Sequence, residues 1–370
     1  MAVILTRMTL HGRTQSSLPI AQRKSKLAKL LARRDSMAQE TLPGTTDKRL
    51  AALLTLLAEN ATIVISGARI AKEIGVSRSM VWQWARQLRG LGVRVKGKAG
   101  EGYFLERVPD ILTPDMVRQR LKGGLFGKRI YHFFKVDSTN RVGLELGHAG
   151  EPEGAVVLAE EQTAGKGRAG RTWQSDRAAG IYVTLLLRPR LAPVQAPLLT
   201  MMAGLSARTA IEATTGLAAD LKWPNDLMMG GKKVGGILTE MHAEPSQVRF
   251  VIVGIGLNVN QEKFPGELGT TASSLRIETG KQVSRLELLV RLLREFENDY
   301  NRFLREGPGA VTAKFEAVSS YARGKRVRVT SGTESFAGVT AGLGPEGLLT
   351  VKRDDGAVVT VISGDVAEAR

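Results

Sequence analysis

The sequence contains no cysteine. This absence excludes disulfide bridges, thiolate metal ligands and a thiol nucleophile, and it favours a reducing cytoplasm as the location of the protein. Long apolar runs are missing as well, since none approaches the roughly 18 residues that a membrane-spanning helix requires. We therefore expect a cytoplasmic protein that has no membrane partner.

Acidic residues are scarce at the beginning of the chain, where none precedes Asp35. Residues 1–46 hold eight Lys/Arg and two Asp/Glu, so this basic extension has a net charge of +6. Its composition superficially resembles a transit peptide, and residues 20–31 could form a short basic helix. Two other interpretations stay open: a disordered arm that contacts DNA, and a start site placed upstream of Met37. We assign no fold to the extension.

The remaining charge is also unevenly distributed along the 370 residues, which are enough for two or three domains with proper cores. Residues 47–110 carry a net charge of +5, and the last 260 residues hold only +6 of the total of +17. A basic N-terminal part followed by a part with little net charge suggests a polyanionic partner for the N-terminal part. The alternative is a charged surface that only interacts with water.

Residues 47–110 are predicted to form a winged helix-turn-helix domain. A helical pattern opens the domain, with apolar residues on one face: Leu50, Leu53, Leu54 and Leu57. Ser66 and Ser77 are N-cap candidates for two more helices, and Gly75 suits the left-handed residue between them. Residues 93–105 contain three glycines and have the pattern of a two-stranded wing.

The second helix of this pair would read DNA. Its predicted buried stripe is Val81, Trp84, Leu88 and Leu91. The candidate DNA-binding residues lie largely off this stripe or in the wing: Arg78, Ser79, Trp82, Arg86, Arg89, Lys96 and Lys98. Cations on this face would neutralise phosphates. The alternative is a three-helix interaction module that never touches DNA.

A linker helix is predicted within residues 111–124, with Thr113 as its cap and Pro114 in the first helical position. Residues 125–321 then alternate between β-like and helical patterns, and residues 182–187 have the apolar run of a strand covered on both faces. Short β-like runs at 327–330, 348–352 and 357–362 indicate a small barrel in residues 322–370. The expected fold class is α+β.

Residues 160–176 form the stretch that most needs a chemical explanation. Gly165, Gly167 and Gly170 alternate with basic side chains, which are Lys166, Arg168 and Arg171. Glycines let backbone N–H groups approach an anion closely, and the cations supply the opposite charge. The stretch therefore predicts an anionic ligand, although Gly/Arg-rich loops also bind nucleic acid or stay disordered.

Three further segments carry related features: Asp137–Asn140 after a β-like run, residues 222–240 with their Lys-Trp-Pro-Asn-Asp and Lys-Lys-Val-Gly-Gly sequences, and the Gly/Asn-rich residues 254–260. In this order and at these separations, the four segments resemble the catalytic domain of biotin–protein ligases. Together with the predicted winged domain, residues 47–370 resemble the bifunctional biotin ligase and biotin-operon repressor of bacteria. The basic extension is not part of that pattern.

This resemblance implies a mixed-sheet ligase domain of the biotin/lipoate type at 125–321 and an SH3-like barrel at 322–370. It implies biotin and ATP as substrates, with biotinyl-adenylate as the intermediate and Arg168 and Lys233 as catalytic residues. The implied biotin-binding residues are Ser138, Thr139, Asn140, Gln162, Lys166, Gly167, Arg168 and Lys233. The implied adenylate-binding residues are Gly165, Gly167, Arg168, Gly170, Gly236 and Asn258.

Other interpretations of single residues stay open. Asp226 is the candidate Mg²⁺ ligand, although Asp and Asn after proline are also common turn formers. Lys233 can instead be a surface residue of a hairpin without a role in catalysis. Trp223 is assigned to the core. The sequence departs from the family pattern at Lys166, where an arginine is usual, so a bidentate contact is lost there.

The resemblance also implies partners: the biotin carboxyl-carrier protein of acetyl-CoA carboxylase, operator DNA, and a second copy of the chain when ligand is bound. Two alternative functions remain at this stage. One is a lipoate or octanoyl ligase, which shares the catalytic fold. The other is a ligand-responsive repressor whose enzyme domain only senses a small molecule.

Overall fold

A computed structural model describes residues 48–61, 63–107 and 110–369 of the chain. The basic extension, with its possible helix at 20–31, lies outside the described residues. Within the part of the chain that is described, no helix is both long and apolar enough to cross a membrane.

The winged unit opens with three helices, α2 Lys48–Glu59, α3 Gly67–Ile74 and α4 Arg78–Gly90. Ser66 and Ser77 cap α3 and α4 by accepting hydrogen bonds from the Arg69 and Met80 N–H groups. Gly75 adopts the left-handed conformation, with φ of 73°, that ends α3. The helix-turn-helix predicted from these residues is confirmed.

A two-stranded antiparallel wing, β1 Val95–Lys98 and β2 Gly102–Leu105, completes this unit. Ile65 pairs with Tyr103 of the wing, and a side chain at Gly102 would lie 2.0 Å from the Ile65 carbonyl oxygen. The wing can therefore pack against the entrance to α3 only because position 102 is glycine. The leucines of α2, with Ile70, Val81, Trp84 and Leu88, form the core of the unit.

The linker helix is confirmed as α5 Pro114–Leu121, with the Thr113 hydroxyl accepting from the Met116 N–H. The left-handed residue that ends it is Lys122, with φ of 55°. A 3₁₀ turn at Leu125–Gly127 (η1) leads into the central domain.

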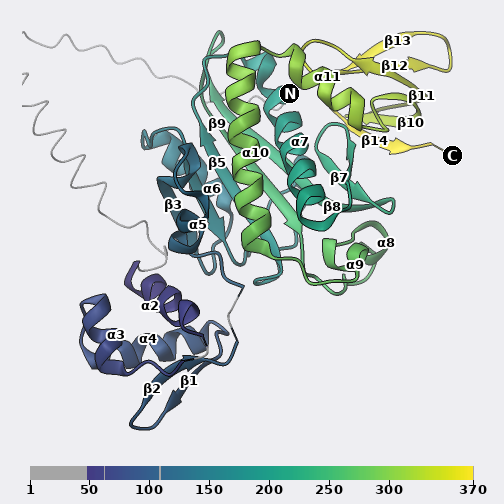
Figure 1. Ribbon diagram of the computed structural model, residues 1–370. Helices are drawn as coiled ribbons and strands as arrows, with labels where there is room; N and C mark the ends of the chain where they lie inside the picture. Colours follow the sequence, from purple (N-terminus) through teal and green to yellow (C-terminus); the bar gives the residue numbers. More distant parts are fainter. Residues whose placement is uncertain (1–47, 62, 108–109, 370) are drawn as a thin grey trace, which may run out of the picture. The chain divides into compact units, whose positions relative to one another are not determined.

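The central domain is built on a seven-stranded mixed sheet with the order β3-β4-β5-β9-β8-β7-β6 (Figure 1). The strands are β3 Arg129–Phe133, β4 Ala155–Ala159, β5 Gly180–Leu187, β6 Asp220–Lys222, β7 Asp226–Met229, β8 Lys232–Ala243 and β9 Val248–Asn258. Only β3 and β4 are parallel. Every residue of β5 is buried, as its apolar run predicts.

Helices cover this sheet on both faces. The Gly143 position of α6 Thr139–His148 lies against Thr184 and Ile252, while Val183, Leu185, Val251 and Val253, which point the other way, share a core with α7 and α10. The remaining helices and turns are η2 Arg168–Gly170, η3 Pro193–Gln195, α7 Ala196–Thr215, α8 Leu268–Thr271, α9 Leu275–Thr279, α10 Arg285–Glu306 and α11 Gly309–Val318.

The C-terminal unit is a five-stranded antiparallel sheet with the order β13-β12-β11-β10-β14. Its strands are β10 Arg323–Ser331, β11 Glu334–Leu343, β12 Leu349–Arg353, β13 Val358–Val361 and β14 Asp365–Glu368. The sequence pattern predicts β10, β12 and β13 but misses β11 and β14. The α+β fold class is confirmed, with a winged unit, a central mixed sheet and a C-terminal antiparallel sheet consistent with an SH3-like domain. The exact boundaries at 47, 111, 125 and 322 stay predictions.

Candidate active site

A cleft with about 460 Å³ of empty space, part of it open to solvent, lies where four segments of the central domain meet. These segments are the start of α6, the glycine-rich loop, β8 and β9. Nine of the predicted site residues line the cleft: Ser138, Thr139, Asn140, Gln162, Lys166, Gly167, Arg168, Lys233 and Gly236. Residues that are more than 100 positions apart are thus brought to one place.

The uncharged wall of the cleft is organised around Gln162. Its amide oxygen accepts hydrogen bonds from the Thr139 N–H at 2.8 Å and the Thr139 hydroxyl at 3.1 Å. Its amide nitrogen donates to the Ser175 hydroxyl at 3.0 Å. The Ser138 hydroxyl makes no cap hydrogen bond to α6, although the side chain is 2% exposed. Ser138 therefore keeps hydrogen-bonding capacity, whereas Gln162 uses most of its own within the protein.

Asn140 uses both of its amide hydrogens inside the protein. Its amide nitrogen donates to the Leu238 carbonyl at 3.1 Å and to the Glu240 carboxylate at 2.7 Å, and its oxygen accepts from the Thr184 hydroxyl at 2.7 Å. A side chain at Gly254 would lie 2.0 Å from the Asn140 oxygen. Asn140 lines the cleft, but the main effect of these contacts is to connect α6 to the sheet.

The glycine-rich loop folds back on itself. The Gly167 N–H donates to the Arg171 carbonyl at 2.7 Å, so that group is already occupied in this conformation. Gly165 is required for packing, since a side chain there would lie 2.5 Å from the Trp173 carbonyl oxygen. Gly170 is required for its φ of 75°. Neither Gly165 nor Gly170 lines the cleft, and the Lys166 side chain is exposed.

Arg168 is the half-buried basic side chain of the loop that lines the cleft, whereas Lys166 is exposed. Its guanidinium donates to the Asn225 amide oxygen at 3.0 Å and to the Gly364 carbonyl at 3.2 Å. Burial lowers the pKa of Arg168, and nearby Asp365 and Asp226 oppose this shift. The exposed Arg171 forms a two-pronged ion pair with Asp365, at 2.7 and 2.8 Å. The loop is thus connected to the C-terminal unit by two arginines.

Lys233 supplies the second positive charge. Its ammonium group lies 2.6 Å from the Asp226 carboxylate, and it also lies over the Trp173 ring, 5.6 Å from the ring centre. The Asp226 oxygen has no well-directed hydrogen bond in the described structure, so the contact is an ion pair by distance only. A side chain at Gly236 would lie 3.0 Å from Lys233 and 3.3 Å from Trp173. Gly236 therefore leaves room for both groups at the cleft.

Trp173 is the principal cleft residue that the sequence reasoning misses. Its ring lies against β9, where a side chain at Gly256 would approach it to 2.6 Å, and its indole N–H is buried without a partner among the described residues. Tyr182 and Asn225 line the cleft as well. The available signal was the pair of glycines at 254 and 256, because glycine within a strand marks close approach by another group.

Two predicted site residues lie beside the cleft without lining it. Asn258 is 5% exposed, and its amide donates to the Ser273 carbonyl at 3.0 Å. Asp226 does not line the cleft, but it pairs with Lys233 and its charge acts on Arg168. Trp223 is buried, as predicted for a core residue, and its indole N–H donates to the Gly347 carbonyl at 2.9 Å.

Comparisons with known proteins match the winged unit, the central domain and the C-terminal unit. The model of the biotin/lipoate A/B protein ligase family matches residues 133–258, a helix-turn-helix model matches 49–104, and the model of the biotin protein ligase C-terminal domain matches 323–367. The bifunctional ligase/repressor of Bacillus spizizenii is 36% identical over 320 residues, which cover 85% of this chain and 97% of the relative. This chain therefore belongs to the bifunctional biotin ligase/repressor family.

Further relatives of the family agree with this assignment. The biotin–[acetyl-CoA-carboxylase] ligase of Mycobacterium tuberculosis is 33% identical over 272 residues, which cover 70% of this chain and 98% of the relative. The structure of the biotin protein ligase from Aquifex aeolicus in complex with biotin and ATP is 32% identical, with a TM-score of 0.56, and the match covers 65% of this chain and 98% of that one.

The winged unit of this family member presents a basic face. The predicted DNA-binding residues are all exposed: Arg78, Ser79, Trp82, Arg86, Arg89, Lys96 and Lys98. The Arg86 guanidinium lies over the Trp82 ring at 5.8 Å, and the Arg89 side chain donates to the Val95 carbonyl at 2.7 Å. Arg89 thus connects α4 to the wing as well as adding charge.

The two wing lysines are ion-paired within the protein. Lys96 lies 2.7 Å from Glu106, and Lys98 lies 2.8 Å from Glu101. In contrast, Arg78 and Arg86 hold no carboxylate partner within the described part of the chain. Unpaired cations are the ones that contribute most when a phosphate approaches, because no existing ion pair has to be broken.

Proposed function

We propose that this protein is an ATP-dependent biotin–protein ligase that also binds operator DNA as a biotin-responsive repressor. The observation that carries the enzymatic part is the cleft itself, which is lined by three cations, Lys166, Arg168 and Lys233, and by uncharged polar side chains. Biotin has a carboxylate at one end and an uncharged ureido ring at the other. A cleft that is lined by both kinds of group suits such a molecule.

In the first step, an oxygen of the biotin carboxylate attacks the α-phosphorus of ATP, and pyrophosphate leaves. Both reactants are anions, so they approach one another only where fixed cations compensate their charge. We assign this compensation to Lys233 and Arg168. Lys233 is held between the Asp226 carboxylate and the Trp173 ring, which fixes its ammonium group at the cleft before the substrates arrive.

In the second step, the amine of an acceptor lysine attacks the carbonyl carbon of biotinyl-adenylate. An amide bond forms, AMP leaves with the bonding electron pair, and the amine loses a proton. The proposed acceptor is the biotin carboxyl-carrier protein of acetyl-CoA carboxylase. Until it arrives, the mixed anhydride has to be protected from water, and we assign this protection to closure of the glycine-rich loop.

Magnesium would enter with the nucleotide. The described residues contain no group of three or more His, Asp and Glu side chains that could hold an ion without other ligands. This donor set fits Mg²⁺ that keeps several waters and takes its main ligands from substrate phosphates, with Asp226 as the single protein carboxylate. The ion would supply charge compensation on the phosphates.

Substrate choice separates biotin ligation from the related lipoate or octanoyl ligation. We expect pyrophosphate release with biotin, ATP and Mg²⁺, and release at no more than about 1% of that rate with lipoate or octanoate at equal concentration. The expected discrimination is large because Ser138 offers a hydrogen-bonding group that an alkyl chain would leave unpaired. Faster turnover with lipoate or octanoate would support the alternative ligase.

The repressor part of the proposal rests on the winged unit together with the family membership. Biotinyl-adenylate would act as the corepressor by favouring a DNA-binding form, which we propose is a dimer of this chain. Such coupling requires the intermediate to bind that form more tightly than the other. A cytoplasmic location, where both biotin and DNA are available, completes the proposal.

DNA affinity should fall steeply as the salt concentration rises. Arg86→Ala is expected to flatten the slope of log K against log salt by about 0.9 units, because one phosphate contact disappears. Lys98→Ala should flatten it less, since Lys98 already holds Glu101 at 2.8 Å. Fluorescence anisotropy of a labelled duplex over a series of salt concentrations measures these slopes.

The matched control is Arg69→Ala, which removes an exposed arginine of α3 that is paired with Glu73 at 2.7 Å. Its slope should equal that of the wild type. Equal slopes for all the variants would mean that α4 does not face DNA, and the unit would then be a protein-interaction module.

A further inference from the structure

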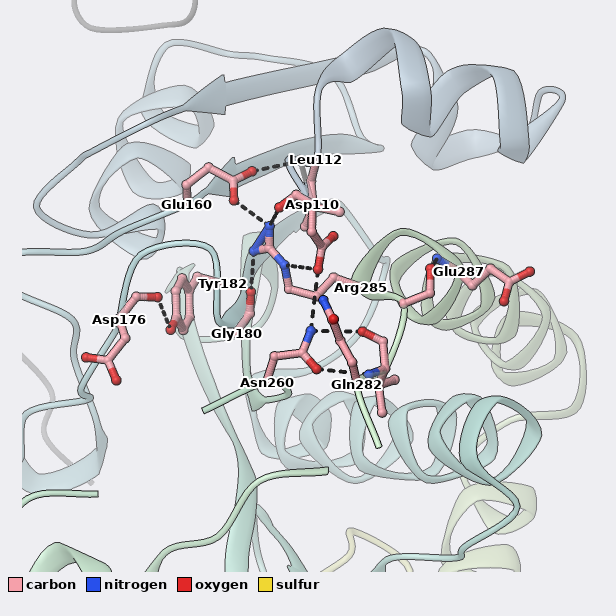
Figure 2. A network of polar contacts seen from close by, with 12 residues as sticks. Asp110, Leu112, Glu160, Asp176, Gly180, Tyr182, Asn260, Gln282, Arg285 and Glu287 are labelled. Atoms are coloured by element: carbon pink, nitrogen blue, oxygen red, sulfur yellow. Dashed lines mark hydrogen bonds and ion pairs between the residues drawn. The ribbon is translucent and has the colours of Figure 1, made fainter. Parts of the chain in front are cut away.

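A buried arginine outside the cleft joins three segments that the proposed function needs to act together. Arg285 is the first residue of α10, and its side chain has no exposed surface. Figure 2 shows its guanidinium at the centre of a network that includes Asp110, Glu160 and Gly180. Arginine is almost never fully buried unless its charge is paired, so the partners of Arg285 explain this burial.

Two of the contacts hold the ends of the segment that carries the glycine-rich loop. Arg285 donates to the Glu160 carboxylate at 2.6 Å and to the Gly180 carbonyl at 2.9 Å. Glu160 directly follows β4, and Gly180 is the first residue of β5. Residues 161–179 therefore leave and re-enter the sheet at points that are fixed by one planar group.

The ends held in this way are close to the cleft in sequence. Gln162, which lines the uncharged wall, follows Glu160 by two residues, and Tyr182, which also lines the cleft, follows Gly180 by two. The Tyr182 hydroxyl donates to the Asp176 carbonyl of the loop segment at 2.9 Å. A shift of either end would thus be transmitted directly to the cleft wall.

The remaining contacts reach the connection to the winged unit. Arg285 donates to the Asp110 carboxylate at 3.1 Å and also to the Asp110 carbonyl. The other oxygen of Glu160 accepts from the Leu112 N–H at 2.8 Å and lies 3.0 Å from the His132 ring nitrogen. Residues 110–112 directly precede the cap of α5, so the loop ends and the interdomain connection share one ion-paired cluster.

The charge of Glu160 is compensated within this cluster. Burial acts to raise the pKa of Glu160, but Arg285 and His132 outweigh it and hold that pKa below its ordinary value. Removing one partner of such a pair leaves an uncompensated buried charge, whereas apolar replacement of both is often tolerated. Burying these charged groups costs more free energy than apolar packing would. Their hydrogen bonds, however, fix the orientation of the segments that they join, which apolar packing does not.

We propose that Arg285 is a positioning residue that holds both ends of the glycine-rich loop segment and, through Asp110, couples the state of the cleft to the connection that leads to the DNA-binding unit. This inference rests on the proposed function. Arg285 touches neither substrate nor DNA, and it acts through Glu160, Gly180 and Asp110.

The proposed coupling between cleft and DNA-binding unit is tested with Asp110→Ala, which removes a side chain outside the cleft. Pyrophosphate release and labelling of the carrier protein should stay within about twofold of wild type. The gain in DNA affinity that biotin plus ATP produces should fall about tenfold, a typical size for coupling between two sites. The DNA probe is a duplex enriched from random sequence by the wild-type protein with biotin and ATP present.

The control for this test is Asp115→Ala, which removes an exposed carboxylate of α5 that pairs with Arg118 at 3.1 Å. A ligand-dependent gain in Asp110→Ala equal to that in the control would overturn the coupling. If the wild-type protein labels the carrier but its DNA affinity does not change when biotin and ATP are added, the coupling and the repressor role are overturned. The ligase activity is not. Absence of labelling would instead overturn the proposed enzyme.

The positioning role is tested with Arg285→Lys and with the double variant Arg285→Met, Glu160→Gln, which removes both charges of the Arg285–Glu160 pair. Both should show a KM for biotin raised about tenfold, with kcat within about threefold, because the loop ends are no longer fixed. Lysine keeps the charge but cannot form the planar set of contacts. A wild-type KM in the double variant, or full rescue by lysine, would contradict the positioning role, and thermal unfolding of each variant shows that it is folded.

Discussion

Lys233→Gln is expected to slow the formation of biotinyl-adenylate by about 10² to 10³-fold, the usual cost of removing one preorganised group that stabilises developing charge. Glutamine keeps much of the side-chain length and can still donate a hydrogen bond, but it carries no charge. Single-turnover release of pyrophosphate measures the step, and circular dichroism at rising temperature measures folding.

Lys232→Gln is the matched control, because Lys232 is the neighbouring residue of β8 and its ammonium group donates to the Gly269 carbonyl at 3.0 Å, away from the cleft. It should form adenylate at nearly the wild-type rate. If Lys233→Gln forms adenylate normally and only unfolds at a lower temperature, Lys233 would be a residue that decorates the hairpin of β7 and β8.

Arg168→Ala is expected to release biotinyl-adenylate into solution about 10 to 150 times faster than the wild type. A hydrogen bond to a charged group contributes roughly 1.5–3 kcal/mol, and each 1.4 kcal/mol corresponds to about tenfold. Two of the Arg168 contacts, with Asn225 and Gly364, already hold the guanidinium at the cleft, so its charge is available without rearrangement.

Rapid filtration of enzyme that has been loaded with labelled biotin and ATP measures this release. Arg177→Ala is the control, since Arg177 follows the loop and its side chain pairs with Glu161 at 3.1 Å without lining the cleft. Release from Arg168→Ala at the rate of Arg177→Ala would remove Arg168 from the site. Diffuse labelling of bystander proteins by Arg168→Ala would be an independent sign of leakage.

The elements that could be predicted from the sequence are those determined by local interactions. Ser66, Ser77 and Thr113 each cap a helix by accepting a hydrogen bond from the N–H group three residues later. The apolar run at residues 182–187 predicts the buried strand β5. Because these signals lie within a few residues of one another, no knowledge of the tertiary structure is needed to interpret them.

Strands β11 and β14 could not be predicted, because their own residues favour them weakly. Gly338 and Gly342 interrupt the pattern of β11, and Val366 is the one buried residue in the four that make up β14. Both are strands because β10 lies between them and pairs with each. Their conformation is determined by partners that are not visible in the local sequence.

The same distinction separates the predicted from the unpredicted parts of the site. The family resemblance carried by the four segments was sufficient to name nine residues that line the cleft. In contrast, Asn140 is held by Leu238 and Glu240, which lie 98 and 100 positions away, and the partners of Arg285 lie 105 to 175 positions away. Such roles depend on contacts that only the folded chain creates.

The measurement that tests the central claim most directly is intact mass spectrometry of a biotin carboxyl-carrier domain after incubation with this protein, biotin, ATP and Mg²⁺. We predict that one biotinyl group is added to the carrier, that AMP is released, and that a carrier with its acceptor Lys replaced by Arg stays unchanged. An unmodified carrier despite bound biotin would contradict the account and leave a protein that only senses biotin, and modification by lipoate in preference to biotin would contradict the substrate assignment.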